Sequence, residues 1–160
     1  MTYDGAVADF VFNIALGRVR ELAALAAAND ALILIMLKTA GLEADTALRD
    51  HDDLAALLAA TNDEADFTGY ARRTLTGVTN TAPDDTNNRA DTDAADPAAW
   101  TNSAASQAIS KTLICYDPDT TGGTDTTVVP LMAYDSVITF DTGVPTTAIF
   151  IAAGIYRAQG

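Results

Sequence analysis

The stretch that most constrains the fold runs from Ile109 to Asp125. Residues 109–116 alternate and are rich in β-branched and aromatic types, which fit the half-buried surface of a pleated strand. The Asp, Pro, Thr and Gly residues that follow favour a turn, because they bond to or accept turn conformations of the backbone. The stretch therefore predicts a strand that leads into a tight polar loop.

Three further strand patterns follow in the last third of the chain, at residues 126–133, 135–140 and 147–157. In the third of these both faces are apolar, which favours a central strand or one covered by a neighbouring subunit. The last third is therefore expected to be a meander of short antiparallel strands. A hairpin is also expected in the middle of the chain, where turn-forming residues at 83–88 precede a return strand at 89–96 with Asp91 and Asp93 facing water.

The first third mixes helix and strand signals. Apolar residues at helical spacing predict a helix over residues 16–28, whereas the continuous aliphatic run Ala31–Lys38 predicts a buried strand. Asp50 is the expected N-cap of a short second helix with Leu54 and Leu57 on its apolar face.

These patterns predict an α+β fold, mostly an antiparallel β-sheet or a small sandwich or barrel, with one or two short helices. The 160 residues fit one domain, which we place at residues 15–160. Residues 1–14 are expected to form an N-terminal arm that contributes little to this domain. Its apolar patch is predicted to bind a partner subunit and consists of Phe10, Val11, Phe12 and Ile14.

The charge of the chain limits its partners. Nine basic residues against 22 acidic residues give a formal net charge of −13. Such a chain repels phosphate backbones, so neither nucleic acid nor an anionic membrane is an expected partner. The longest apolar run is also far shorter than the ~20 residues that a membrane-spanning helix needs.

The residues that commonly carry catalysis are scarce. His51 is the only histidine and Cys115 the only cysteine, so neither a catalytic triad nor a tetrahedral zinc site can be assembled from them. His51 is expected on the solvated surface, Cys115 in the core as a small hydrophobe, and Trp100 as a core anchor with a bonded indole N–H. We expect neither an enzyme nor a cofactor.

One acidic loop invites comparison with a calcium site. Asp117, Asp119 and Asp125 fall at positions 1, 3 and 9 of an EF-hand loop, but position 12 is Val128 where that loop needs a bidentate Glu. The flanks also suit strands better than helices. A hairpin loop without metal is the favoured interpretation, and a calcium site with these three carboxylates is the alternative.

Several short segments resemble a family of small virion proteins of tailed bacteriophages, and the resemblance covers residues 10–158. They are Asn-Asp-Ala-Leu-Ile (29–33), Gly-Leu-Glu-Ala-Asp (41–45), Asp-Leu-Ala-Ala-Leu-Leu (53–58), Asp-Asp-Thr-Asn-Asn-Arg (84–89), Ser-Lys (110–111) and Ile-Cys-Tyr-Asp-Pro-Asp-Thr-Thr-Gly-Gly-Thr-Asp (114–125). The family has no catalytic motif.

The resemblance implies a structural protein of the virion. We expect a capsid decoration (cement) protein that binds the major capsid protein on the outer surface of the head as a homotrimer. The alternative is a tail or baseplate subunit, that is, a minor tail protein. A calcium-dependent binding module is a third interpretation.

Overall fold

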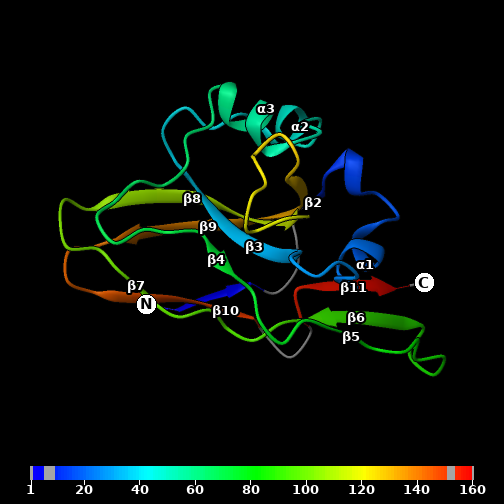
Figure 1. The fold of residues 1–160 in the computed structure, drawn as a ribbon. Helices are drawn as coiled ribbons and strands as arrows, with labels where there is room; N and C mark the ends of the chain where they lie inside the picture. Colours follow the sequence, from blue (N-terminus) through cyan, green and yellow to red (C-terminus); the bar gives the residue numbers. More distant parts are fainter. Residues whose placement is uncertain (1, 6–9, 151–153, 160) are drawn as a thin grey trace.

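The computed structural model describes residues 2–5, 10–150 and 154–159. Its centre is an antiparallel sheet in the strand order β2 (Phe10–Val11), β9 (Val129–Phe140), β8 (Gln107–Asp117), β3 (Ala31–Lys38) and β4 (Arg73–Thr74). Helices α2 (Asp45–Leu48) and α3 (Leu54–Ala59) lie over one face of this sheet (Figure 1). The short helices η1 (Asn13–Ala15) and α1 (Val19–Leu22) lie near its β2 end.

Two smaller sheets lie on the other side of the central sheet (Figure 1). One has the order β1 (Thr2–Gly5), β10 (Pro145–Phe150) and β7 (Trp100–Thr101), and the other has the order β11 (Tyr156–Gln159), β6 (Arg89–Asp93) and β5 (Thr79–Asn80). Only the β1–β10 pairing is parallel among the described strands. The predicted α+β class with mostly antiparallel strands is confirmed.

The central sheet follows the aliphatic patterns of the sequence. Strand β3 has the predicted bounds, and its first seven residues are all buried because layers cover both faces of the sheet. Strand β8 extends the predicted strand by a few residues and pairs with β9. The strands predicted for residues 126–133 and 135–140 form one strand, β9, which begins three residues later than predicted, at Val129. It is continuous because pairing with β8 goes on past residue 134, with a register shift between Asp135 and Ile138.

The strand predicted for residues 147–157 is not continuous. Its first part lies in β10, a central strand as expected, and its last part lies in β11, at the edge of a different sheet. Gly154 has φ +75° and a Cβ there would lie 2.3 Å from the Thr92 carbonyl oxygen, so the turn into β11 requires glycine. Residues 151–153 of the prediction lie outside the described residues.

The helix predicted for residues 16–28 is wrong except for one turn, α1. Gly17 precedes that turn with φ +76°, and Leu25 follows it with φ +49°. The side-chain amide of Asn80 donates to the carbonyl oxygen of Ala23 at 3.2 Å. That acceptor is therefore bonded from another element, and the chain turns away instead of continuing the helix.

Helix α3 begins three residues later than predicted. Its N-cap is Asp53, whose Oδ1 accepts from the Ala56 N–H at 2.7 Å, while Asp50 accepts from the Asn13 side chain at 2.5 Å. Leu54 and Leu57 are buried, as the apolar face required. The hairpin in the middle of the chain consists of β5 and β6, and its return strand β6 ends at Asp93, three residues earlier than predicted. Asp91 does not face water, because Arg157 of β11 binds it at 2.7 Å.

The N-terminal segment is part of the domain. Strand β1 pairs with β10, β2 pairs with β9, and Phe12 is 0% exposed with its N–H bonded to the Leu131 carbonyl at 3.0 Å. The predicted boundary between an arm at 1–14 and a domain at 15–160 is therefore wrong for residues 10–14. The sequence showed an apolar patch at this position, but not that the patch completes the chain's own core.

Candidate interaction surface

Two loops meet where β8 begins and β9 ends, and a buried asparagine joins them. Asn102 is 0% exposed, and its Nδ2 donates to the carbonyl oxygens of Ala105 at 2.9 Å and Phe140 at 2.8 Å. Its Oδ1 accepts from the Ala104 N–H at 3.0 Å. A buried amide with all these partners holds both loops in one conformation.

The backbone and neighbouring side chains reinforce this junction. The Gly143 N–H donates to the Asn102 carbonyl at 2.6 Å, and Gly143 has φ +77°, a conformation that favours glycine. The Ser106 hydroxyl donates to the Asp141 carboxylate at 3.0 Å, and the Thr142 hydroxyl donates to the Ala104 carbonyl. The loops at residues 102–106 and 141–144 therefore form a rigid end of the molecule.

This end carries an exposed surface of small uncharged residues. Val137 is 88% exposed, the most exposed of the large hydrophobic side chains in the described part of the chain. We use the name strand-end surface for six exposed residues: Ala104, Ala105, Ala108, Val137, Thr139 and Val144.

The strand register makes this surface continuous. Val137 and Thr139 point to the same face of β9, and Ala108 of β8 lies directly opposite Thr139. The next step along the two strands is the Ser106–Asp141 hydrogen bond, which leads into both loops. In Figure 1 this end of β8 and β9 lies away from α2 and α3.

Charge is sparse on the strand-end surface and dense elsewhere. The two loops contain one charged residue, Asp141, and the next charge along β9 is Asp135, which binds Lys111 at 2.7 Å. The chain as a whole carries 22 acidic residues. The uncharged exposed residues Val137 and Thr139 therefore lie between two exposed carboxylates, Asp135 and Asp141.

All nine basic side chains bond within the chain. Six pair with carboxylates: Arg18, Lys38, Arg72, Arg89, Lys111 and Arg157. The other three donate to backbone carbonyl oxygens: Arg20, Arg49 and Arg73. The last three keep their positive charge, because a carbonyl oxygen is neutral, and the negative excess of the chain comes from its 22 acidic against nine basic residues.

The four predicted partner-binding residues occupy the edge of the central sheet. Phe10, Val11 and Ile14 are half-buried and pack on the core, while Phe12 is fully buried in it. The Phe10 and Phe12 rings meet edge to face at 5.2 Å. Phe12 cannot reach a partner in this conformation, and the binding of a partner by the other three stays a prediction.

Sequence reasoning missed a buried cation beside this edge. The Lys111 side chain is 4% exposed, and its Nζ lies 2.7 Å from Asp135, 3.0 Å from Asp45 and 5.4 Å from the centre of the Phe10 ring. The two carboxylates compensate the charge that burial would otherwise make costly. A lysine within a strand pattern that also holds Ile109, Leu113 and Ile114 was the signal available in the sequence.

The candidate calcium residues are engaged by protein groups. Asp117 Oδ1 accepts from the Asp119 N–H at 3.0 Å, and Asp119 Oδ1 accepts from the Thr121 hydroxyl at 2.6 Å. Asp125 binds both terminal nitrogens of Arg72, at 2.5 and 2.9 Å. Within the described residues no group of three His, Cys, Asp or Glu side chains is placed to hold a metal ion.

Arg72 fastens this loop to the body of the protein. Besides Asp125, it binds Glu64 at 2.7 Å, and Glu64 accepts from the Tyr70 hydroxyl at 2.7 Å. Its hydrogen bonds to Asp125 and then to Glu64 raise the pKa of Arg72, and Arg72 lowers the pKa of Asp125. Nearby Cys115 is fully buried, as predicted, and burial raises the pKa of its thiol.

His51 is not the solvated residue that we expected. Its Nε2 lies 2.8 Å from Glu43 Oε2, and Asn62 donates to the same oxygen at 2.7 Å. These hydrogen bonds, that from His51 first, lower the pKa of Glu43. The cluster links the segment before α2 to the segment after α3.

Trp100 is buried as predicted, with its indole N–H bonded to the Ala71 carbonyl at 2.8 Å.

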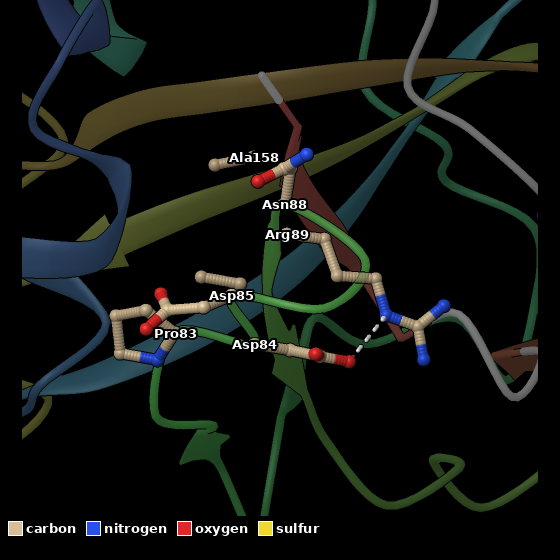
Figure 2. A pocket seen from close by; sticks show the side chains of 7 residues that line it. Pro83, Asp84, Asp85, Asn88, Arg89 and Ala158 are labelled. Carbon is tan, nitrogen blue, oxygen red and sulfur yellow. Dashed lines mark ion pairs between the residues drawn. The ribbon is translucent and has the colours of Figure 1, made fainter.

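A shallow pocket of about 380 Å³ lies beside the β5–β6 turn (Figure 2). Asp84 and Arg89 face each other there with 3.9 Å between Oδ2 and Nε, and Ala158 lines another side. Asp84 also accepts from the Thr86 and Asn87 N–H groups. Its polar groups are therefore used in holding the turn, and it offers a weaker interaction surface than the strand ends.

Comparison of the chain with protein-family models, with curated proteins and with solved structures finds no match. Among the described residues, no helix is long and apolar enough to cross a membrane.

Proposed function

We propose that the protein is a structural virion protein of a tailed bacteriophage, a capsid decoration protein that binds the outer surface of the head and stabilises the shell. The resemblance of its segments, above all residues 114–125, supports the assignment to a virion. Decoration proteins reuse one surface around local symmetry axes, so we propose a homotrimer bound to the major capsid protein. No enzymatic activity or cofactor forms part of this function.

The observation that carries the outer location is the charge distribution. Packaged DNA presents about one negative charge per 1.7 Å of duplex. A chain of net charge −13 is repelled by that DNA. The outer face of the shell imposes no such repulsion.

On the outer face the same negative charge favours attachment. It keeps free copies apart before assembly and attracts them toward basic patches on the capsid protein. Such steering acts over a Debye length of about 8 Å at physiological salt, so it speeds encounter without fixing the bound state. Apolar contacts made after encounter are needed to hold the protein in place.

The test is a binding time course of purified protein on undecorated heads at low and high ionic strength. We expect raised salt to slow attachment without releasing bound protein, and bound copies to match the capsid protein in number. Neutralising two exposed carboxylates, Asp52→Asn with Asp63→Asn, should slow attachment at low salt only. An attachment rate that does not change with ionic strength, or a copy number far below that of the capsid protein, would favour a tail or baseplate subunit instead.

A further inference from the structure

We infer that the N-terminal strap, which we define as residues 10–14, is held by charge and opens in acid while the rest of the fold stays closed. The inference does not depend on the proposed function. It concerns the residues predicted to bind a partner, because opening would expose apolar side chains that now pack on or in the core: Phe10, Val11, Phe12 and Ile14.

The backbone of the strap makes short-range contacts with the body of the protein. Strand β2 pairs with β9 at two residues. Beyond it, the Phe12 N–H donates to the Leu131 carbonyl and the Asn13 N–H donates to the Arg49 carbonyl, each at 3.0 Å. A short segment held in this way can open at a lower free energy than the whole fold, so its side-chain contacts decide how often it does.

Two cations lie against the first ring of the strap. The centre of the Phe10 ring is 5.4 Å from Lys111 Nζ and 5.8 Å from the guanidinium carbon of Arg49, within the range of a cation–π interaction. The Lys111 side chain is 4% exposed, so water solvates its ammonium group little. A buried charge beside a second charge of the same sign is stable only while anions compensate it.

Carboxylates from two elements supply that compensation. Asp135 of β9 lies 2.7 Å from Lys111 Nζ, and Asp45 of α2 lies 3.0 Å from it. The Asp45 carbonyl also accepts from Arg49 Nε at 3.2 Å, so one residue holds both cations in place.

A third carboxylate binds the strap itself. Asp50 accepts from the Asn13 side chain at 2.5 Å. The strap is therefore faced by two cations and by three carboxylates, and its docking depends on the balance between them.

Acid removes the anions and leaves the cations. The side chains of Asp45 and Asp135 are 45% and 67% exposed, so protons reach both of them. Once protonated, they no longer balance Lys111, whose ammonium group keeps its charge in acid. Opening the strap lets water solvate that ammonium, so the open form gains stability relative to the docked form as pH falls.

The experiment is amide hydrogen exchange of the full chain by NMR at pH of about 7 and about 4, expressed as protection relative to the unfolded chain. The Phe12 and Asn13 amides report on the strap. The Leu75 amide, bonded to the Leu32 carbonyl of β3 at 2.8 Å, reports on the central sheet. Lys111→Met removes the buried charge, and Lys38→Met is the matched control, because it removes the other lysine of the chain, which pairs with Asp66 at 2.8 Å.

In the wild type and in Lys38→Met, acid should lower the protection of the strap amides at least about tenfold more than that of Leu75. In Lys111→Met the extra fall should be less than about threefold, the remainder coming from Asp50. Strap and Leu75 amides that lose protection together overturn the inference, and so does a Lys111→Met chain with the wild-type fall.

A second variant keeps the test decisive if Lys111→Met does not fold. Asp45→Asn with Asp135→Asn removes the compensating charges at every pH. It should lower the protection of the strap amides already at neutral pH and leave little further fall in acid. Wild-type protection of the strap at neutral pH in this variant overturns the inference as well.

Discussion

The two halves of β9 both pair with β8 but differ in how far they are buried. From Pro130 to Tyr134 every residue is buried, whichever face its side chain takes. From Asp135 to Phe140 burial alternates, and every second residue is exposed. Both halves pair with β8, with a register shift between Asp135 and Ile138, but only the first half also pairs with β2, at Met132 and Ala133.

The difference in burial comes from the segments that lie beside and over the first half. Next to the first half, Phe12 bonds to Leu131, and Leu54 at the start of α3 bonds to Val128 at 2.9 Å, so the N-terminal segment and the helices cover that face. The second half has no helix over it (Figure 1). A strand can thus be core at one end and a candidate contact surface at the other.

The largest expected effect separates these halves directly. Phe12→Ala should lower the free energy of unfolding by about 3–5 kcal/mol, because it removes a fully buried ring and leaves a cavity. Val137→Ala should change it by less than about 0.5 kcal/mol, since the side chain is already in water. Urea unfolding of both variants measures the contrast, and similar losses would mean that the two halves do not differ in this way.

Asn102→Ala sharpens the comparison from the exposed end. It should lower the free energy of unfolding by about 2–3 kcal/mol, because the buried Phe140 carbonyl and the Ala105 carbonyl both lose a donor. Ser106→Ala removes an exposed hydrogen bond of the same junction and should cost well under about 1 kcal/mol. Thermal unfolding ranks the two, and equal melting temperatures would show that Asn102 does not hold the loops.

Arg72→Met tests the loop that leads into the covered half. The variant should lower the free energy of unfolding by about 1–3 kcal/mol at neutral pH, because Glu64 and Asp125 lose their cation at a half-buried site. Lys38→Met is the control, since its partner Asp66 is exposed and surface pairs contribute about 0–1 kcal/mol.

The cost of Arg72→Met should depend on pH in one direction. Arg72 lowers the pKa of Asp125 in the folded chain below the unfolded value of about 3.9. The pair therefore stabilises the fold fully above that value, and the contribution is lost as pH falls through the lowered pKa. Wild-type and variant stabilities should converge in acid, and a difference that grew on acidification would contradict this account.

The smallest expected effect concerns metal. A chelator should leave the melting temperature unchanged, since Asp125 already binds Arg72 and the loop lacks the bidentate Glu of an EF-hand. Thermal scans with chelator and with added calcium measure this. A fall of several degrees that calcium reverses would instead favour the calcium site.

The sequence predicted those elements whose signal is local. Strand Ala31–Lys38 could be predicted because a strand buried on both faces needs an unbroken aliphatic run. The turn at residues 83–88 could be predicted from its own turn chemistry. The burial of Cys115 and Trp100 followed from residue type and context.

The tertiary structure decided the outcome wherever a group that is distant in the sequence binds the same backbone atoms or covers the same face. The helix at residues 16–28 ends early where Asn80 bonds Ala23, the predicted arm enters the core because β9 pairs with it, and Asp91 is covered by Arg157. The strand-end surface depends in the same way on where α2 and α3 stop. Amino-acid patterns state which residues favour burial, but only the packing of elements far apart in the chain settles which of them are covered.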